Sequence, residues 1–192
     1  MVAPPSDHGG ATIAAVGIRD AVAPAIEHVW AALALVPDPE VPAVSIVELG
    51  IVRDIRLAST CAEPSVTIRL TTTYSGCPAT AMIESLIRAE LATIGITAVA
   101  IGYQLAPAWT TDWIAPEARA KLRAFGIAPP HLVAAAIDVT GISPLRRPNV
   151  VVPCPRCGSP QTKLLAQFGS TACKAQYRCN ACLEPFDYFK PH

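Results

Sequence analysis

Four cysteines near the C-terminus have the spacing of a metal site. They form two Cys-x-x-Cys pairs, Cys154 with Cys157 and Cys179 with Cys182, and 21 residues separate the pairs. Two residues between thiolates allow a tight turn to direct both sulfurs at one ion, and two such turns complete a tetrahedral shell of four sulfurs. We expect one structural zinc ion per chain at these cysteines. An iron–sulfur cluster, which also takes four thiolates, stays open as an alternative.

The sequence around this motif predicts a zinc ribbon. Short strands are expected at 163–168, 175–177 and 186–189, and the module has few large apolar residues, so it needs a metal ion to hold its fold. A fifth cysteine, Cys173, has no obvious partner in the sequence. It is either a buried thiol without a role or an extra ligand or exchange thiol of the metal site.

Another cysteine, Cys77, lies between an expected strand and an expected helix. If Cys77 caps that helix and Pro78 is the first helical residue, the thiol lies at the positive end of the helix dipole, which favours the thiolate. Such a thiolate can bind a metal ion or a cluster transiently. The alternative is a small capping residue, and no histidine is placed to serve as the base for nucleophilic catalysis. Asp38 and Glu40 are either solvated charges of a turn or part of a polar site near Cys77.

Apolar periodicity predicts the elements that must position Cys77. Their order is α-β-β-α-β-α, which gives an α+β fold, a small α/β sandwich, followed by the zinc ribbon. They comprise a helix that begins at Pro24, an extended stretch at 44–57, strands at 66–71 and 99–103, a helix opened by 76–78 and a helix from Pro116 to Gly126. Inward-facing side chains of the last two helices are expected at Met82, Ile83, Leu86, Ile87, Ile94, Leu122 and Phe125.

Charge and cysteine content divide the chain near residue 149. Residues 1–149 carry 10 basic and 13 acidic side chains, whereas residues 150–192 carry 5 basic and 2 acidic ones together with five of the seven cysteines. The predicted organisation is a flexible tail at 1–22, an α/β domain at 23–142, a linker at 143–149 and the zinc ribbon at 150–192.

The overall composition excludes several classes of protein. Fifteen basic residues balance fifteen acidic ones, 52% of residues are hydrophobic and 16% are charged, which excludes a disordered chain and a strongly basic nucleic-acid binder. Apolar stretches stop short of the roughly 20 residues of a membrane span, and the N-terminus lacks the basic segment of a signal peptide. We therefore expect a cytoplasmic protein with no membrane partner, whose weakly charged surface is typical of a protein that binds other proteins.

Two segments of the first domain resemble a known family. Residues 37–52, with the sequence PDPE followed by VELGIV, and residues 72–78, TTYSGCP, are similar to the metal–sulfur cluster assembly domain of SufT-like proteins. That family has a small α/β fold and acts in cytosolic iron–sulfur protein maturation. The resemblance places its cysteine at Cys77 and its acidic turn at Asp38 and Glu40. Glu48 stands where the family commonly has aspartate, which keeps the carboxylate.

The remaining motifs resemble the PaaD family. They are the segments at 108–114, 126–130, 168–175 and 184–186, and the match extends from about Val29 to Lys190. This resemblance implies an accessory subunit of the multicomponent monooxygenase that epoxidises phenylacetyl-CoA in aerobic phenylacetate degradation. It implies the oxygenase and ferredoxin-type reductase components as partners, with help in assembling an iron–sulfur or metal centre in one of them. The alternatives are a stoichiometric docking subunit of the oxygenase and, more remotely, a zinc ribbon that binds nucleic acid.

Two tryptophans add a candidate docking surface. Trp109 and Trp113 are four residues apart and either pack in the core or form an exposed aromatic surface for a partner, and we expect the exposed surface. We expect no catalytic activity of the chain itself. It has no helical Glu-x-x-His pair for a di-iron centre, no Gly-x-Gly-x-x-Gly fingerprint and no plant-type ferredoxin run of cysteines.

Overall fold

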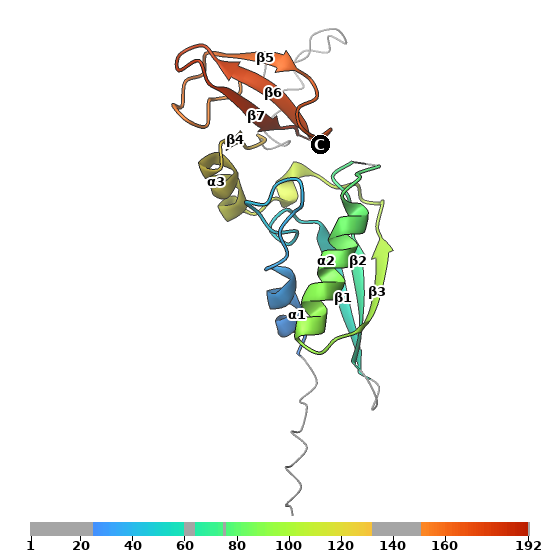
Figure 1. Cartoon of the computed structure of the whole chain (residues 1–192). Coiled ribbons are helices and arrows are strands. Elements are labelled where there is room, and N and C mark those ends of the chain that lie inside the picture. The colour runs from blue at the N-terminus through green and yellow to red at the C-terminus, as the bar shows by residue number, and fades with distance from the viewer. Residues whose placement is uncertain (1–24, 60–63, 75, 132–150, 192) are drawn as a thin grey trace, which may run out of the picture.

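The computed structural model describes residues 25–59, 64–74, 76–131 and 151–191 (Figure 1). The first part of the chain contains helices, a short 3₁₀ helix and strands in the order α1 Ile26–Leu33, β1 Val52–Ser59, β2 Pro64–Leu70, α2 Thr80–Thr93, β3 Ala98–Tyr103, η1 Thr111–Trp113 and α3 Pro116–Ala124. The predicted α+β class and its order of helices and strands are confirmed. The predicted tail at 1–22 and linker at 143–149 lie outside the described residues.

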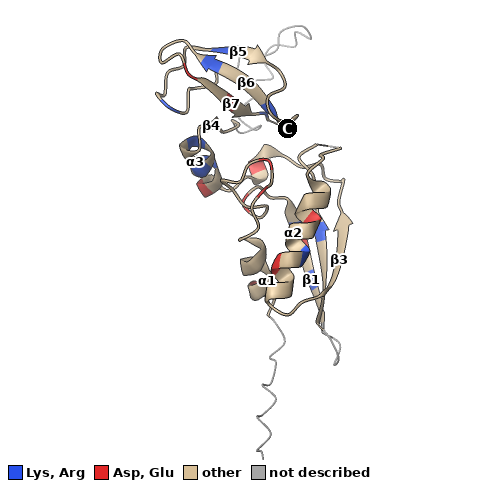
Figure 2. Ribbon diagram, in the orientation of Figure 1, with Lys and Arg blue, Asp and Glu red and all other residues tan. Residues whose placement is uncertain are grey.

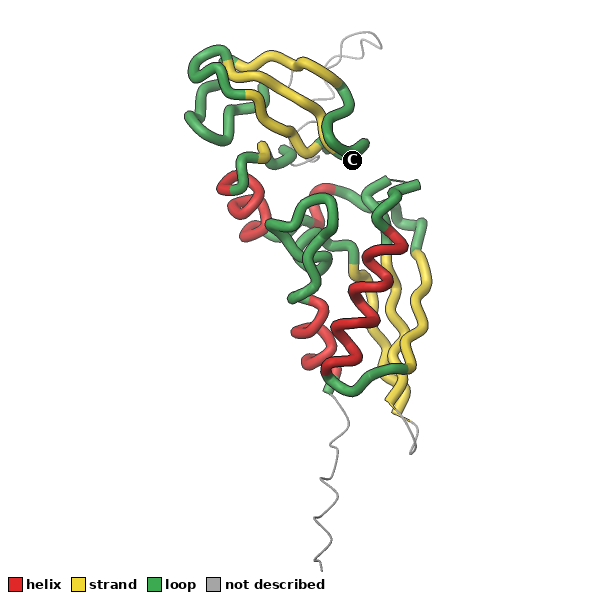
Figure 3. Tube along the Cα trace, viewed as in Figure 1, coloured by secondary structure: helices red, strands yellow, loops and turns green. Residues whose placement is uncertain are grey.

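The first sheet has the strand order β1-β2-β3, with β1 and β2 antiparallel and β2 and β3 parallel. Because side chains alternate along a strand, Val66, Ile68 and Leu70 of β2 share one face, and all three are buried. Helix α2 lies along this sheet and α1 lies beside α2 (Figure 3). This arrangement brings the loop after α1 and the loop before α2 to the same end of the sheet.

Some predicted inward-facing side chains point outward instead. Ile83 and Ile87 of α2 are buried and Leu122 of α3 is buried, as predicted. Met82, by contrast, is 55% exposed, since it falls beside the stripe of Ile83, Ile87 and Leu91, which repeats at the helical period. The expectation is also wrong for Ile94 and Phe125, the C-cap residues of their helices, which are 37% and 58% exposed.

The predicted extended stretch at 44–57 is a strand only from Val52 onward. Before it, Ser45 and Glu48 form a reciprocal capping box, in which the Ser45 amide donates to Glu48 Oε2 at 2.9 Å and the Glu48 amide donates to Ser45 Oγ at 3.2 Å. Gly50 closes the turn with a φ of +69°, and a Cβ there would lie 2.8 Å from Trp113 Cβ. The turn is thus packed tightly against the segment that contains the tryptophans.

The second sheet forms the ribbon. It contains β5 Thr162–Ala166, β6 Lys174–Cys179, β7 Pro185–Phe189 and the two-residue strand β4 Ile127–Ala128, in the order β4-β7-β6-β5. Strand β4 precedes the ribbon segment in the sequence and pairs with β7 in parallel, so the two parts of the chain share this sheet. Figure 2 shows Lys and Arg on α3 and on ribbon strands, and acidic residues in the loop between α1 and β1. No helix in these described ranges is long and apolar enough to span a bilayer.

Candidate metal centres

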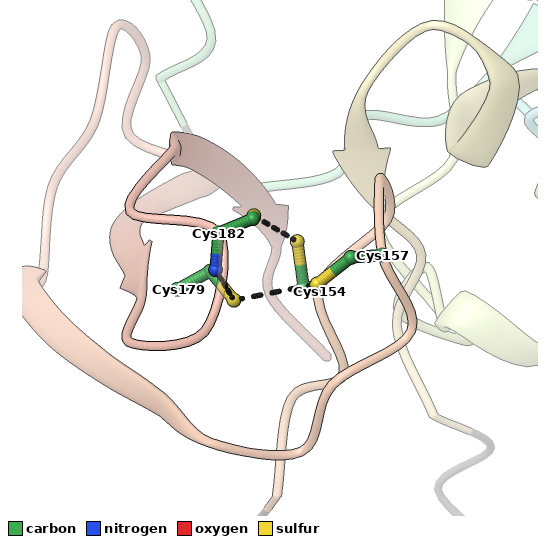
Figure 4. Close-up of side chains that lie close together, drawn as sticks. All are labelled: Cys154, Cys157, Cys179 and Cys182. Carbon is green, nitrogen blue, oxygen red and sulfur yellow. Dashed lines mark hydrogen bonds between the residues drawn. The ribbon is translucent and has the colours of Figure 1, made fainter.

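The four ribbon cysteines converge at one point. The sulfurs of Cys154, Cys157, Cys179 and Cys182 all lie within 4.8 Å of one another, which makes them a group that could hold a metal ion (Figure 4). The Cys154 and Cys182 sulfurs are 3.8 Å apart, and the Cys157 and Cys179 sulfurs are 3.5 Å apart. Four sulfurs at such distances fit the tetrahedral shell of a structural zinc site.

Two similar turns hold these thiols. The residue after each pair, Gly158 and Leu183, has a positive φ, +73° and +65° respectively. The leucine therefore adopts the same left-handed turn that glycine adopts in the first loop, despite the cost to its side chain. The amides of Ala181 and Cys182 approach Cys179 Sγ at 3.4 and 3.5 Å, and these backbone hydrogen bonds lower the pKa of the Cys179 thiol. The loop thus favours the thiolate of Cys179, whereas contacts with the other cysteine sulfurs leave the pKa of Cys182 raised.

A second group of donors lines a small cavity between the two parts of the chain. Cys77, Cys173, Asp38 and Glu40 all line it, and Phe189 of β7 forms part of the apolar wall. The cavity has about 20 Å³ of open space, which is room for about one water molecule or one ion. Its walls come from the α1–β1 loop, the segment before α2 and the ribbon.

Asp38 shapes the loop that presents Glu40. The buried Asp38 Oδ1 accepts hydrogen bonds from the amides of Glu40 at 2.9 Å and Val41 at 2.8 Å. Burial raises the pKa of this carboxyl, although the two amides act in the opposite direction. Sequence left two alternatives for Asp38 and Glu40, and the structure places both residues at the wall of the cavity.

The side chain of Cys173 contacts the carboxyl group of Glu40. Its sulfur is 3.6 Å from Glu40 Oε2 and 3.0 Å from Thr171 Oγ1, and its side chain is buried. Burial, followed by the negative charge of Glu40, raises the pKa of this thiol to about 11. Cys173 is not part of the four-cysteine group, so of the two alternatives left by the sequence the structure favours a buried thiol over an extra ligand of the ribbon site.

Cys77 lies between strand β2 and helix α2, as predicted, but it does not cap the helix. Helix α2 begins at Thr80 with Ala79 as its N-cap, so Cys77 precedes the cap by two residues. Burial and the charges of Glu40 and Asp38 raise the pKa of the Cys77 thiol and outweigh the backbone hydrogen bond from Ala79. The expectation of a thiolate stabilised by the helix dipole is therefore wrong for this structure.

Both tryptophans are engaged within the chain. Trp109 is 4% exposed, and its Nε1 donates to the Leu49 carbonyl oxygen at 2.9 Å. Its ring packs on Phe189 with 6.1 Å between centroids, so Trp109 joins the two parts of the protein in one core. Trp113 is half-buried under the Arg53 guanidinium, 3.5 Å from the ring centroid. The expected docking surface is thus wrong for Trp109, which is a core residue because it has a buried polar partner and an apolar neighbour.

The contact between Glu40 and the ribbon was not predicted by any sequence motif. Glu40 and Cys173 are separated by 133 positions, and only the packing of β6 and β7 against the first part of the chain brings them together. Lys174 belongs to the same contact, since its Nζ donates to the Glu40 carbonyl oxygen at 3.3 Å. The sequence offers one weak signal for this contact: Cys173 and Lys174, a possible metal ligand and a charged residue, lie side by side where strand β6 begins.

Comparisons with known proteins agree with this two-part structure. The family model "PaaD zinc beta ribbon domain" matches residues 141–190, and "Iron-sulfur cluster assembly protein" matches residues 26–101. A protein of Escherichia coli (strain K12), whose name describes it as a subunit of 1,2-phenylacetyl-CoA epoxidase, is 47% identical over 167 residues, which cover 87% of this chain and 93% of that protein. The chain belongs to the PaaD family. The family resemblance expected from sequence motifs is confirmed.

Relatives of the first part alone are also found. A protein of Porphyromonas gingivalis (strain ATCC BAA-308 / W83), named "Fe-S protein maturation auxiliary factor", is 30% identical over 97 residues, which cover 50% of this PaaD-family chain and 89% of the relative. A crystal structure of a domain of unknown function, DUF59, from Bacillus anthracis is 28% identical and covers 50% of this chain and 89% of its own, with a TM-score of 0.45.

Proposed function

We propose that the chain is an accessory subunit of a multicomponent phenylacetyl-CoA monooxygenase and assists the assembly of an iron–sulfur or metal centre in a partner component. The relative named as an epoxidase subunit supports the first part, and the relative named as a maturation factor supports the second. The observation that carries the assembly role is the ion-sized cavity lined by Cys77 and Glu40. The proposed partners are the oxygenase and ferredoxin-type reductase components, in the cytoplasm.

The two metal centres have different duties in this proposal. Zinc fills the ribbon site, where four thiolates leave no open coordination position, so that ion is structural. The cavity has mixed sulfur and oxygen donors, which suit iron. We treat iron there as cargo, held by Cys77 and Glu40 in transit. Incomplete coordination allows a partner's ligands to take the cargo over.

The test is to produce the reductase component with and without this chain and to measure its iron and sulfide. Wild-type chain should give a full complement of both, whereas Cys77→Ser should give no more than the reductase produced alone. Glu117→Gln is the control, because Glu117 is exposed on α3 and outside both metal centres.

A reductase that acquires its full iron and sulfide without the chain would contradict the assembly role. Stable co-purification of the chain with the oxygenase components, at equal molar amounts, would then favour the docking subunit.

A further inference from the structure

We propose that the ribbon completes the cargo site: Cys173, Cys77 and Glu40 together bind a single ferrous ion. The inference rests on the proposed function, because it takes the cavity as the cargo site. It goes further in naming the cargo as one ion rather than a preformed cluster and in assigning the second thiolate to the ribbon.

The first support is that three separate segments meet at the cavity. Glu40 comes from the α1–β1 loop, Cys77 from the segment before α2 and Cys173 from the residue before β6. The contact between the Cys173 sulfur and Glu40 Oε2, at 3.6 Å, already joins two of the proposed ligands. Two thiolates and a carboxylate form a mixed donor set that suits a divalent transition metal.

The second support is that packing fixes Cys173 at this wall. The Lys190 amide donates to the Cys173 carbonyl oxygen at 2.9 Å, and Lys174 Nζ donates to the Glu40 carbonyl oxygen at 3.3 Å. Phe189 is buried against Trp109 in the core shared by both parts of the chain. Cys173 is therefore held against the cavity by contacts on both sides and does not depend on a loop movement.

The third support is charge and size. The wall carries the carboxylates of Asp38 and Glu40, whereas the nearby buried Lys174 ammonium pairs with the Asp187 carboxylate at 3.7 Å and reaches only the backbone carbonyl of Glu40. A divalent cation compensates the wall carboxylates and the thiolates formed on binding. The cavity, at about 20 Å³, accommodates one ion, whereas a cluster would require the walls to separate.

The arrangement also explains release. Among the described residues, the four ribbon cysteines form the only group of three or more Cys, His, Asp or Glu side chains whose ligand atoms all lie within 4.8 Å of one another. The donors of the cavity must therefore turn inward to bind, and this cost makes the bound ion easier to give up. Glu40 can move because its neighbour Asp38, and not Glu40 itself, holds the turn through the amides of Glu40 and Val41.

The experiment loads the zinc-containing full chain anaerobically with Fe²⁺ alone, without sulfide. Iron affinity is measured by titration, and X-ray absorption at the iron edge counts the sulfur neighbours of the bound iron. Wild type should bind one iron with two sulfur neighbours. Cys77→Ser and Cys173→Ser should each weaken iron binding at least tenfold while zinc stays at one per chain, and Glu117→Gln should bind iron as wild type does.

The outcomes separate this inference from the proposed function. If Cys77→Ser loses iron, Cys173→Ser keeps it and the wild-type iron has one sulfur neighbour, the composite site is wrong and the cargo role of Cys77 stands. If wild type binds no iron, both fail. Four sulfur neighbours would place iron in the ribbon and would also overturn the inference. If Cys173→Ser does not fold, the sulfur count of wild type decides.

Discussion

The two cysteine groups of this protein differ in how the chain brings them together. The ribbon thiols come from two tight turns within 29 positions, and their sulfurs lie within 4.8 Å of one another. The cavity thiols, Cys77 and Cys173, come from different parts of the chain and meet only because the ribbon packs on the first sheet's loops. In our proposal, the first group binds an ion that holds the fold, and the second binds an ion that is passed on to a partner.

The thiols also differ in proton affinity, although the pKa values of Cys157 and Cys182 in the ribbon are raised like those of the cavity thiols. Backbone hydrogen bonds lower the pKa of Cys179 in the ribbon. Burial raises the pKa values of Cys77 and Cys173 at the cavity, and neighbouring carboxylates act in the same direction. A metal-free ribbon thus presents one ready thiolate, at Cys179, whereas a metal ion must displace protons from both Cys77 and Cys173 to bind at the cavity.

The largest expected difference between the two cysteine groups comes from replacing a ribbon ligand. Cys179→Ser should remove the zinc and unfold β5, β6 and β7, because structural zinc contributes on the order of 10 kcal/mol of binding free energy to such modules. Zinc content and hydrogen exchange of residues 162–189 measure the effect. Cys173→Ser is the matched control and should keep its zinc; equal zinc loss in both variants would contradict the separation of the two groups.

A smaller effect is expected where the two parts meet. Trp109→Ala should lower the free energy of unfolding by about 3–5 kcal/mol, since it removes a buried ring that packs on Phe189. Trp113→Ala should cost about 1 kcal/mol, because its ring is half-buried beneath Arg53. Denaturant unfolding measures both. Unchanged stability of Trp109→Ala, combined with loss of binding to the oxygenase components, would restore the docking interpretation.

The smallest expected effect on stability comes from replacing Glu48, which lies in the turn before β1 and outside both cysteine groups. Burial alone raises the pKa of Glu48, but Lys121 at 2.6 Å and the Ser45 amide outweigh it, so the net shift is downward. A lowered carboxyl pKa stabilises the fold above the unfolded-state pKa, and this contribution disappears as the pH falls through the folded-state value. Glu48→Gln should therefore cost at most about 1 kcal/mol at neutral pH and nothing in acid.

The free energies of unfolding of wild type and Glu48→Gln, measured from neutral to acidic pH, test this pH dependence. A stability difference that grows as the pH falls would contradict the lowered pKa of Glu48. Iron and zinc contents should be the same in both proteins, because the Glu48 side chain bonds to Ser45 and Lys121 and lines neither centre.

Local features of this fold could be predicted from sequence, and contacts between distant segments could not. Alternation at 66–70 predicted a strand correctly, and the paired cysteines predicted turns that do converge. The strand start at Val52 was missed because the capping box of Ser45 and Glu48 folds the preceding apolar residues into a turn. The composite cavity was missed because no local pattern reports which loop a ribbon residue will contact.

Cys77 shows how a rule based on local helix geometry can predict the wrong direction for a pKa shift. A cysteine just before a helix predicts a lowered pKa when helix geometry alone is considered. The α1–β1 loop brings Glu40 and Asp38 near the thiol and buries it, and these effects raise the pKa instead. The helix begins at Thr80 rather than Pro78, which also moves the thiol away from the first turn.

The cargo role of the Cys77 cavity is tested most directly by the metal and sulfide content of anaerobically purified wild type and Cys77→Ser, with absorption spectra of both. We expect about one zinc per chain in each protein and iron in wild type only. Sulfide together with the iron would mean that a cluster, rather than a single ion, is carried. Zinc alone in both proteins, with no iron after reconstitution, would contradict the cargo role.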